Sequence, residues 1–224
     1  MPSRAYGNEW LQIRHQDSIL LSLPKKGDPY EEIYKVNNKW YGLVYEARWL
    51  NPAGLDDRNL ARTHRLLDAA KAFHTAIENT FHEQSYAHYG NDATRRAWHF
   101  VLWDISLPLT PAQVDALRLT GDSLQGRLTL TDSSRLPTPT QPSAGKAKLP
   151  PAPVSISAVL RPATDAGDQT VPVHSANSQL ASRKFKGIFR QTGYEHQSSY
   201  SDHGALRSTL YSIIQIARTM TWSK

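Results

Sequence analysis

The sequence predicts an α/β fold, and three observations lead to that prediction. Residues 154–160 and 185–189 are short apolar runs of strand length. Each run is followed by a loop that carries one chemically distinctive side chain, an acid in residues 167–172 and a histidine in residues 193–200. The chain then ends in an amphipathic helical pattern. Strand, acidic loop, strand, histidine loop and closing helix together indicate a sheet whose loops gather at one edge.

Asp168 and His196 are the candidate catalytic residues. They are 28 residues apart (196 − 168), which leaves room for a crossover and one strand between two adjacent loops. In a serine-hydrolase triad the histidine moves the proton, and the aspartate fixes the imidazole tautomer. His174 is too close to Asp168 to belong to the next loop, and His203 falls at the start of the last helix. Taken alone, Asp168 is equally compatible with an ordinary surface turn.

The sequences of these loops resemble those of a known family. Residues 167–172 read Gly-Asp-Gln-Thr-Val-Pro and resemble the Gly-Asp-Gly-Thr-Val-Pro turn of lipases. Residues 193–200 resemble the histidine loop of bacterial type VI secretion lipase effectors. Residues 28–34 with 39–42, and residues 85–90, are similar to the same family. The resemblance implies the C-terminal portion of an α/β-hydrolase fold, with its last core strands and helix, joined to a mixed α+β cap-like region.

The chain departs from that family at the nucleophile. A lipase of this kind carries its serine on a Gly-x-Ser-x-Gly elbow. No two of the 12 glycines bracket a serine at that spacing, and residues 121–126 miss it by one position. Residues 121–124 match the letters of the GDSL esterase signature, but the late Asp-x-x-His of that family is absent. The resemblance therefore implies part of a lipase or phospholipase that supplies Asp168 and His196, lacks the serine, and is inactive alone.

Composition excludes several classes of function. The chain has 224 residues, a net charge of +6 and scattered basic residues, without a nucleic-acid-binding motif. No apolar run approaches the length of a membrane span, and residues 1–20 do not have the pattern of a signal peptide. The absence of cysteine excludes disulfides and thiolate chemistry. The nine histidines are not at ligand spacing, so we expect neither a metal nor another cofactor.

Three segments are expected along the chain. Residues 1–132 form the cap-like or inserted region. Residues 133–153 are rich in Pro, Ser, Thr, Ala and Lys and are predicted to be a flexible linker. Residues 154–224 form the hydrolase core segment with the acidic and histidine loops. Because Met1 is not preceded by the early strands of such a fold, we expect the chain to be cut from a larger protein.

Within the cap-like region the sequence predicts strands at residues 19–23, 39–50, 97–105 and 127–131, the last at a sheet edge. A helix is expected over residues 57–82, with an apolar stripe that packs on a sheet or forms a lid: Leu66, Ala70, Phe73, Ile77 and Phe81. Thr110 is expected to cap a short helix that ends at Gly121. The tryptophans and tyrosines either fill the core or line an acyl-chain groove.

The last helix is expected to begin at Ser201 or Asp202. Its apolar face requires a sheet to cover it: Leu206, Leu210, Ile213, Ile214 and Ala217.

Two hypotheses for function remain open. In the first, the chain belongs to a lipid-ester hydrolase that acts on a phospholipid membrane surface, with the serine on a missing upstream chain. The resemblance then implies bacterial cytoplasm before export and the periplasm of a target cell. In the second, the chain is a non-catalytic remnant or interaction module that binds a partner chain, an immunity protein or the secretion spike. Neither hypothesis involves nucleic acid.

Overall fold

The computed structural model describes residues 4–45, 47–50, 52–53, 59–132 and 154–221. They form two compact units, each built from two stretches of the chain. The first unit contains Met1–Phe73 and Phe100–Arg161, and the second contains His74–His99 and Pro162–Lys224. The predicted linker, residues 133–153, lies outside the described residues.

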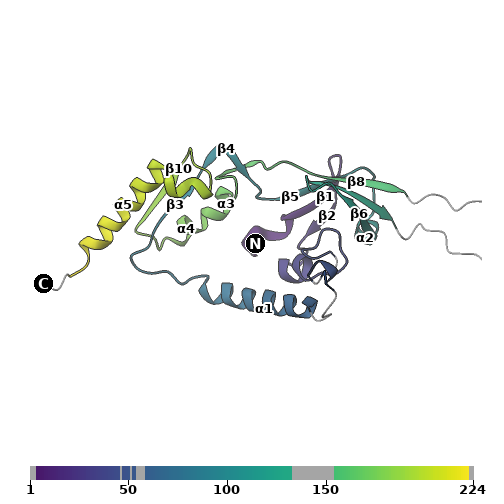
Figure 1. Ribbon diagram of the computed structural model, residues 1–224, viewed down its shortest axis with the longest axis horizontal. Coiled ribbons are helices and arrows are strands. Elements are labelled where there is room, and N and C mark those ends of the chain that lie inside the picture. Colours follow the sequence, from purple (N-terminus) through teal and green to yellow (C-terminus); the bar gives the residue numbers. More distant parts are fainter. Residues whose placement is uncertain (1–3, 46, 51, 54–58, 133–153, 222–224) are drawn as a thin grey trace, which may run out of the picture. The chain divides into compact units, whose positions relative to one another are not determined.

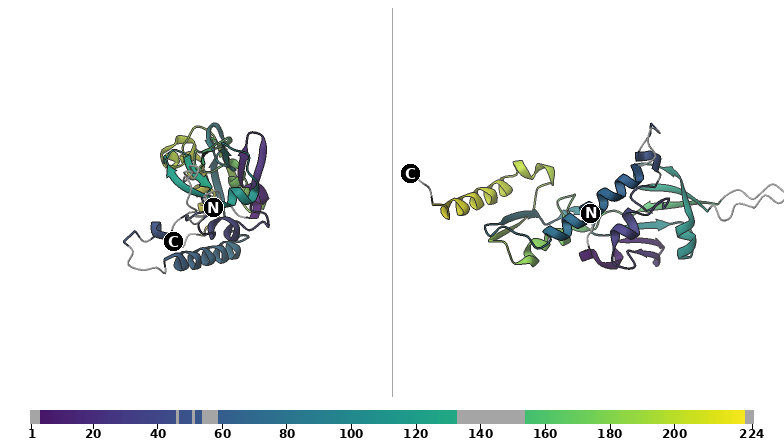
Figure 2. Two further views of the ribbon diagram at one scale, coloured as in Figure 1. Left: turned by 90° about the vertical axis from the view of Figure 1, so that its right-hand side faces the viewer. Right: turned by 90° about the horizontal axis from the view of Figure 1, so that it is seen from below.

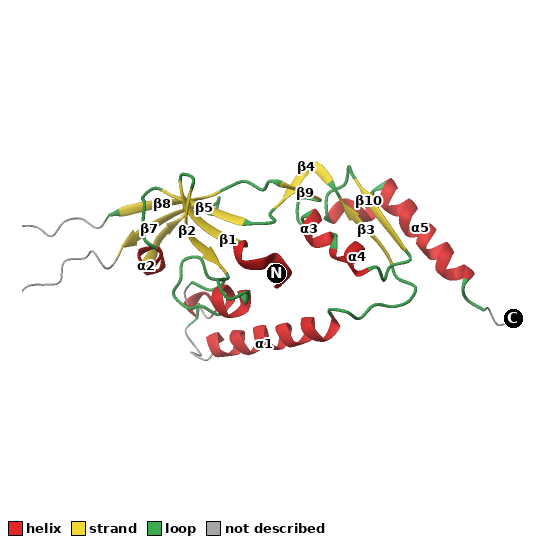
Figure 3. Ribbon diagram, turned by 180° about the vertical axis from the view of Figure 1, so that it is seen from behind, coloured by secondary structure: helices red, strands yellow, loops and turns green. Residues whose placement is uncertain are grey.

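The first unit is built on a six-stranded mixed sheet, whose strands are yellow in Figure 3. Its order is β2-β1-β5-β8-β7-β6. Only β1 and β5 run parallel, and the other neighbours are antiparallel. The strands are β1 (Leu11–His15), β2 (Ser18–Leu23), β5 (Val101–Ile105), β6 (Leu117–Asp122), β7 (Arg127–Asp132) and β8 (Ser155–Leu160).

Strand β7 differs from the expectation for residues 127–131. It lies inside the sheet between β8 and β6, where an edge strand was predicted. Thr110 caps α2 (Pro111–Ala116) through a capping box with Gln113, as predicted. The helix ends at Ala116 because β6 starts at the next residue, so the predicted end at Gly121 is wrong.

Aromatic side chains fill the core of this unit. Trp40 is buried, lies edge-on to Trp103 with 5.8 Å between ring centroids, and donates its indole N–H to the carbonyl of Val114 at 3.1 Å. The expected strand at residues 39–50 is not present. The described residues there form turns and η3 (Ala47–Leu50), preceded by the π-helix η2 (Tyr30–Tyr34). A further short helix, η1 (Arg4–Glu9), opens the described chain.

The long helix α1 (Asn59–Ile77) forms inside the predicted range (Figure 2). Its predicted packing face is wrong, because Leu66, Phe73 and Ile77 are exposed while Leu67 is buried. Two ion pairs lie next to Leu67 on the observed face: Lys35 with Asp68, and Asp28 with Lys71.

The second unit contains two small strand pairs and several helices. Strands β3 (Tyr86–Gly90) and β10 (Gly187–Gln191) are parallel, and β4 (Asp92–Ala97) and β9 (Asp165–Gly167) are antiparallel. The helices are α3 (Val173–Ala176), α4 (Ser178–Ser182), η5 (Gln197–Ser201) and α5 (His203–Arg218). Strand β10 lies two residues later than the predicted run at residues 185–189.

Helices cover both faces of the β3–β10 pair (Figure 1). On one face, Phe189 of β10 meets Tyr211 of α5 with 5.7 Å between ring centroids. On the other face, the hydroxyl of Tyr89 donates to Asn177, between α3 and α4, at 2.6 Å. This local arrangement of helix, parallel strands and helix agrees with the predicted α/β class.

Helix α5 begins where the sequence predicts. The Asp202 side chain accepts a hydrogen bond from the Ala205 amide at 2.9 Å. The buried residues of the helix are the small Ala205 and Ser208. Its predicted apolar face remains open in the described structure, with Leu210 and Ile213 58% and 57% exposed.

The two units do not follow the expected division at residues 133–153. Strand β8, expected in the hydrolase core, pairs with β5 and β7 in the first unit. Strands β3 and β4, expected in the cap-like region, lie in the second unit with the two loops. Among the described helices, none combines the length and the apolar character that crossing a membrane requires.

Candidate active site

The acidic loop is a tight turn held by the Asp168 side chain. Oδ1 of Asp168 accepts hydrogen bonds from the amides of Thr170 at 3.1 Å and Val171 at 2.7 Å. The turn leaves no room at Gly167, where an added Cβ would lie 2.4 Å from the carbonyl oxygen of Val171. Asp168 follows β9 directly and is buried. The turn therefore holds the Asp168 carboxylate in place independently of any contact with His196.

His196 meets the other oxygen of the same carboxylate. Its Nδ1 lies 2.9 Å from Oδ2 of Asp168, and its backbone amide donates to the carbonyl of Asp168, also at 2.9 Å. The two loops meet although their strands do not pair as expected, because β10, which precedes the histidine loop, pairs with β3, and β9, which precedes the acidic loop, pairs with β4. The imidazole side chain is 47% exposed and the carboxylate side chain 9% exposed. One side of the imidazole ring is thus held and the other faces outward.

The ionisation of Asp168 decides which tautomer His196 adopts. Burial raises the pKa of Asp168, but the amides of Val171 and Thr170 and the imidazole of His196 outweigh burial and bring the pKa below its ordinary value. A carboxylate only accepts hydrogen bonds, so Nδ1 must carry the proton. In neutral imidazole, Nε2 then has the free lone pair. Within the described residues, Nε2 has no hydrogen-bond partner.

Gly90, at the end of β3, is a positioning residue that the sequence analysis did not single out by itself. An added Cβ there would lie 2.6 Å from Cβ of Asp168 and 3.0 Å from the carbonyl oxygen of Gly167. Only glycine allows β3 to approach the acidic loop so closely. Gly90 and Asp168 are 78 residues apart (168 − 90) in the chain, so their contact was not visible from local sequence pattern.

Asp92 and Arg95 of β4 connect the two loops, and we call this pair the loop clamp. Asp92 Oδ2 accepts from the amide of Gly193 at 2.9 Å. Arg95 donates to the carbonyl of Gly193 at 3.3 Å and to the side chain of Gln169 at 3.4 Å. The Gln169 amide returns a bond to the Arg95 carbonyl at 3.2 Å. The clamp therefore holds the histidine loop and the acidic loop to one strand.

The charge of Asp92 is favoured by these contacts. The hydroxyl and amide of Thr94, followed by the amide of Gly193, lower the pKa of Asp92 to about 2. The only local signal for this residue is weak, because Asp followed two residues later by Thr is ordinary turn chemistry. Nothing in that signal indicated its bond to Gly193, 101 residues away.

Tyr194 is the buried residue of the histidine loop. Its side chain is buried, and its ring packs edge-on against His88 with 6.2 Å between centroids. Burial, assisted by the charges of Asp168 and Asp202, raises the pKa of Tyr194 to about 12. The phenol therefore stays neutral and supports the loop by packing.

Neither of the rival histidines, His174 and His203, bonds to Asp168 in the described structure. His174 stacks on His99 with 3.8 Å between ring centroids, and Nδ1 of His99 lies 2.8 Å from Asp165. His203 is the first residue of α5. Among the described residues, no group of three or more acidic or histidine side chains could hold a metal ion.

Comparison with protein-family models and with curated proteins gives no match. Among solved structures, the chain matches one chain in the crystal structure of the Tle4-Tli4 complex. The two are 27% identical and superpose with a TM-score of 0.67 over 99% of this chain. The match spans 45% of the other chain, so this chain covers less than half of that length. The similarity supports a relation to the type VI secretion lipase effectors that the loop sequences resemble.

Proposed function

We propose that this chain supplies the acid–base pair of a lipid-ester hydrolase of the type VI secretion effector kind. Asp168 orients the imidazole of His196, and His196 acts as general base and then as general acid. The nucleophilic serine is contributed by a segment outside this sequence. The observation that carries the proposal is the 2.9 Å contact between Nδ1 of His196 and Oδ2 of Asp168, with Nε2 left open.

The chemistry follows from that geometry. Nε2 of His196 takes the proton from the serine hydroxyl as its oxygen attacks the ester carbonyl. The imidazolium that forms is stabilised by the adjacent Asp168 carboxylate. It then gives the proton to the departing alcohol, which leaves an acyl-serine. Water hydrolyses the acyl-serine by the same proton transfers, which releases the fatty acid and restores the serine.

The chain alone should have almost no esterase activity in this proposal. Loss of a triad nucleophile costs about a millionfold in the best-measured protease. The nucleophile is therefore expected in a segment outside this sequence that corresponds to the part of the matched chain without a counterpart here. We call it the complementary segment. The proposal requires that the complementary segment carry a Gly-x-Ser-x-Gly elbow.

The test is to co-express this chain with the complementary segment and measure ester release from phospholipid vesicles. Asp168→Asn and His196→Ala should each abolish the activity of the assembled pair. Glu195→Gln is the matched control, since Glu195 only accepts bonds from the amides of its own loop, Gln197 and Ser198. Unchanged ester release in both triad variants would refute the proposed roles.

A second candidate function is a non-catalytic interaction module that binds a partner chain, an immunity protein or a secretion component. The exposed apolar face of α5 favours it, because such faces mark binding sites. The matched structure is itself a complex of two proteins. Binding of a partner without ester release from the assembled pair would select this function over the first.

A further inference from the structure

Strand β3 has one edge without a neighbouring strand. Among the described strands, β3 pairs with β10 alone. The hydrogen bonds at its two ends show which residues point to β10: the carbonyl of Ser85 accepts from Lys186, and the amide of Asn91 donates to Gln191. Because N–H and C=O groups alternate in direction along a strand, those of Tyr86 and His88 point the other way. They have no backbone partner in the described part of the chain.

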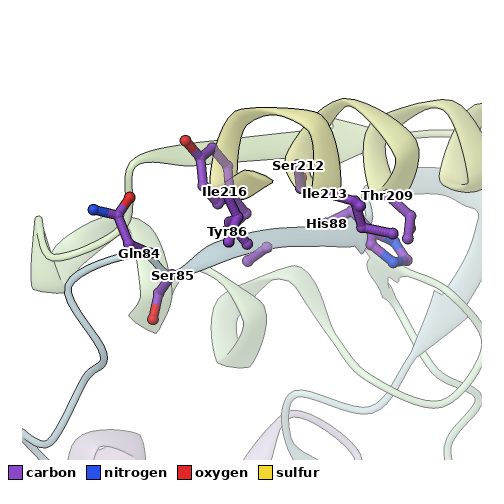
Figure 4. Close-up of a pocket in the computed structure, with 9 residues that line it drawn as sticks. Gln84, Ser85, Tyr86, His88, Thr209, Ser212, Ile213 and Ile216 are labelled. Carbon is purple, nitrogen blue, oxygen red and sulfur yellow. The ribbon is translucent and has the colours of Figure 1, made fainter. Parts of the chain in front are cut away.

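A groove runs along this edge. It has a volume of about 400 Å³ and is lined by residues 84–88 on one side and by Thr209, Ser212, Ile213 and Ile216 of α5 on the other. Tyr86 and His88, whose backbone groups point away from β10, are among the residues that line it, so the groove reaches the open edge of β3. Figure 4 shows the helix running along the strand, with His88 beside Thr209 and Ile213.

We propose that this groove is the docking site for an extended apolar strand of the complementary segment. The strand would pair with the open N–H and C=O groups of Tyr86 and His88, and its side chains would pack against α5. This inference rests on the proposed function, because it names where the nucleophile-bearing segment attaches.

Three observations favour that occupant. A two-stranded parallel sheet is not stable by itself and normally continues into further strands. The chain covers 45% of its structural match, so the other chain has a long remainder from which such strands can come. Finally, β3 ends at Gly90, which contacts Asp168. A parallel strand beside β3 would end at the same edge of the sheet, where Nε2 of His196 is open.

The groove lining contains no acidic, lysine or arginine side chain, and Ile213 and Ile216 of α5 give it an apolar wall. Ile213 is 57% exposed, and Leu210 and Leu206 continue the apolar surface along α5. Covering such side chains is the main favourable term in association. A charged or strongly basic ligand would find no ionic partner among the groove residues named here. The chemistry therefore fits a strand of β-branched and aliphatic residues.

The test compares two tryptophan variants of the full chain. Ser212→Trp fills the groove, whereas Arg207→Trp adds the same ring to an exposed position of α5 outside it. Binding to the purified complementary segment is measured by calorimetry, and amide exchange is followed by NMR. We expect Ser212→Trp to weaken binding by about tenfold or more and Arg207→Trp to leave it unchanged.

Amide exchange supplies an internal control. The amides of Tyr86 and His88 should exchange rapidly in the free chain and slow on binding. Those of Ala87 and Tyr89, which point to β10, should be slow in both states. Protection of Tyr86 and His88 in the free chain would show that this chain, or a second copy of it, already fills the groove. That result would overturn the proposal, as would equal binding by the two tryptophan variants or no binding at all.

These outcomes are separate from those of the proposed function. Groove-dependent binding without ester release would leave the docking site intact and remove the catalytic role. Ester release that Ser212→Trp does not change would keep the catalytic role and remove the docking site.

Discussion

Asp168 divides its two oxygen atoms between two tasks. Oδ1 accepts the amides of Thr170 and Val171 and so closes the turn. Oδ2 accepts from Nδ1 of His196 and so selects the tautomer. The two tasks can be separated by Asn, whose oxygen can still close the turn while its amide nitrogen can only donate toward His196.

Asp168→Asn is therefore expected to invert the tautomer of His196. With a donor at the position of Oδ2, Nδ1 must become the acceptor, and the proton moves to Nε2. Nitrogen NMR of the chain alone would detect the change. In the assembled hydrolase, ester release should fall by about 10⁴-fold, as for the same substitution in a protease triad. Persistence of the Nδ1–H form in the variant would contradict this reading.

Gly90→Ala is expected to disturb the site without touching His196. The added methyl would lie 2.6 Å from Cβ of Asp168, so the acidic loop must move. Overpacking of this kind costs about 1–3 kcal/mol, which chemical denaturation can measure. The NMR signal of the His196 Nδ1 proton should weaken together with stability.

Gly121→Ala is the matched control for that variant. An added Cβ at Gly121 would lie 3.4 Å from Thr129, which is ordinary van der Waals contact. Equal losses of stability in the two alanine variants would show that the approach of β3 to Asp168 has no special role.

At the scale of elements, β4 holds the two loops through the loop clamp, Asp92 and Arg95. Asp92→Ala removes the acceptor of the Gly193 amide, so amide exchange at Gly193 and His196 should become faster. Asp122→Ala is a suitable comparison, because Asp122 caps a hairpin turn through Leu124 in the other unit. Unaltered exchange at Gly193 in Asp92→Ala would exclude a clamping role for Asp92.

Elements with a local signal were predicted well. Asp202 and Thr110 each cap a helix as expected, because the side chain and the amide it binds lie three residues apart. The prediction of a strand at residues 39–50 was wrong. Trp40 and Tyr45 are each buried in the core, but the described residues around them form irregular turns. The packing face of α1 was also wrong. Periodicity predicts an apolar stripe, but Leu67 is the buried residue, and ion pairs to Lys35 and Asp28 lie beside it.

Only part of the candidate site could be predicted from the sequence. Asp168 and His196 stand out because each sits in a short loop with a distinctive pattern. Their support from Gly90 and Asp92 comes from β3 and β4, which the sequence analysis placed in a different segment. Contacts across about 80 to 100 residues depend on tertiary pairing, which local pattern does not encode.

For the whole molecule, the carboxylates give a definite pH dependence. The pKa values of Asp28, Asp92, Asp115 and Asp168 are all lowered from the ordinary value of 3.8. A group whose pKa is lowered by folding stabilises the folded state above its unfolded pKa and loses that contribution as pH falls through the folded pKa.

These four carboxylates should therefore make the same contribution to the free energy of unfolding throughout the neutral range. That contribution should decline as the pH falls from about 4 toward about 2. Thermal unfolding at a series of pH values would measure the decline. The unfolding temperature should fall less steeply with pH in the double variant with Asp92→Asn and Asp168→Asn, because two of the four carboxylates are removed. An unfolding midpoint independent of pH in that window would contradict the assignment.

The division into two units also depends on strand pairs between segments that are far apart in the sequence. Residues 74–99 join residues 162–224 although more than sixty residues separate them, because β3 pairs with β10 and β4 with β9. The sequence predicts that the strands at residues 154–160 and 185–189 belong to one sheet. The first is instead β8, which lies between β5 and β7 in the mixed sheet of the other unit.

The half-exposed ring of His196 has a practical consequence. Small acylating reagents such as diethyl pyrocarbonate attack an unprotonated imidazole nitrogen, and Nε2 is the one left accessible. The label would mark this nitrogen in the bare polypeptide and should be blocked once a serine hydroxyl is seated against it. Under the proposed function, peptide mass spectrometry of the carbethoxylated residue would thus measure the fraction of molecules in which a serine covers Nε2, even when no turnover can be recorded.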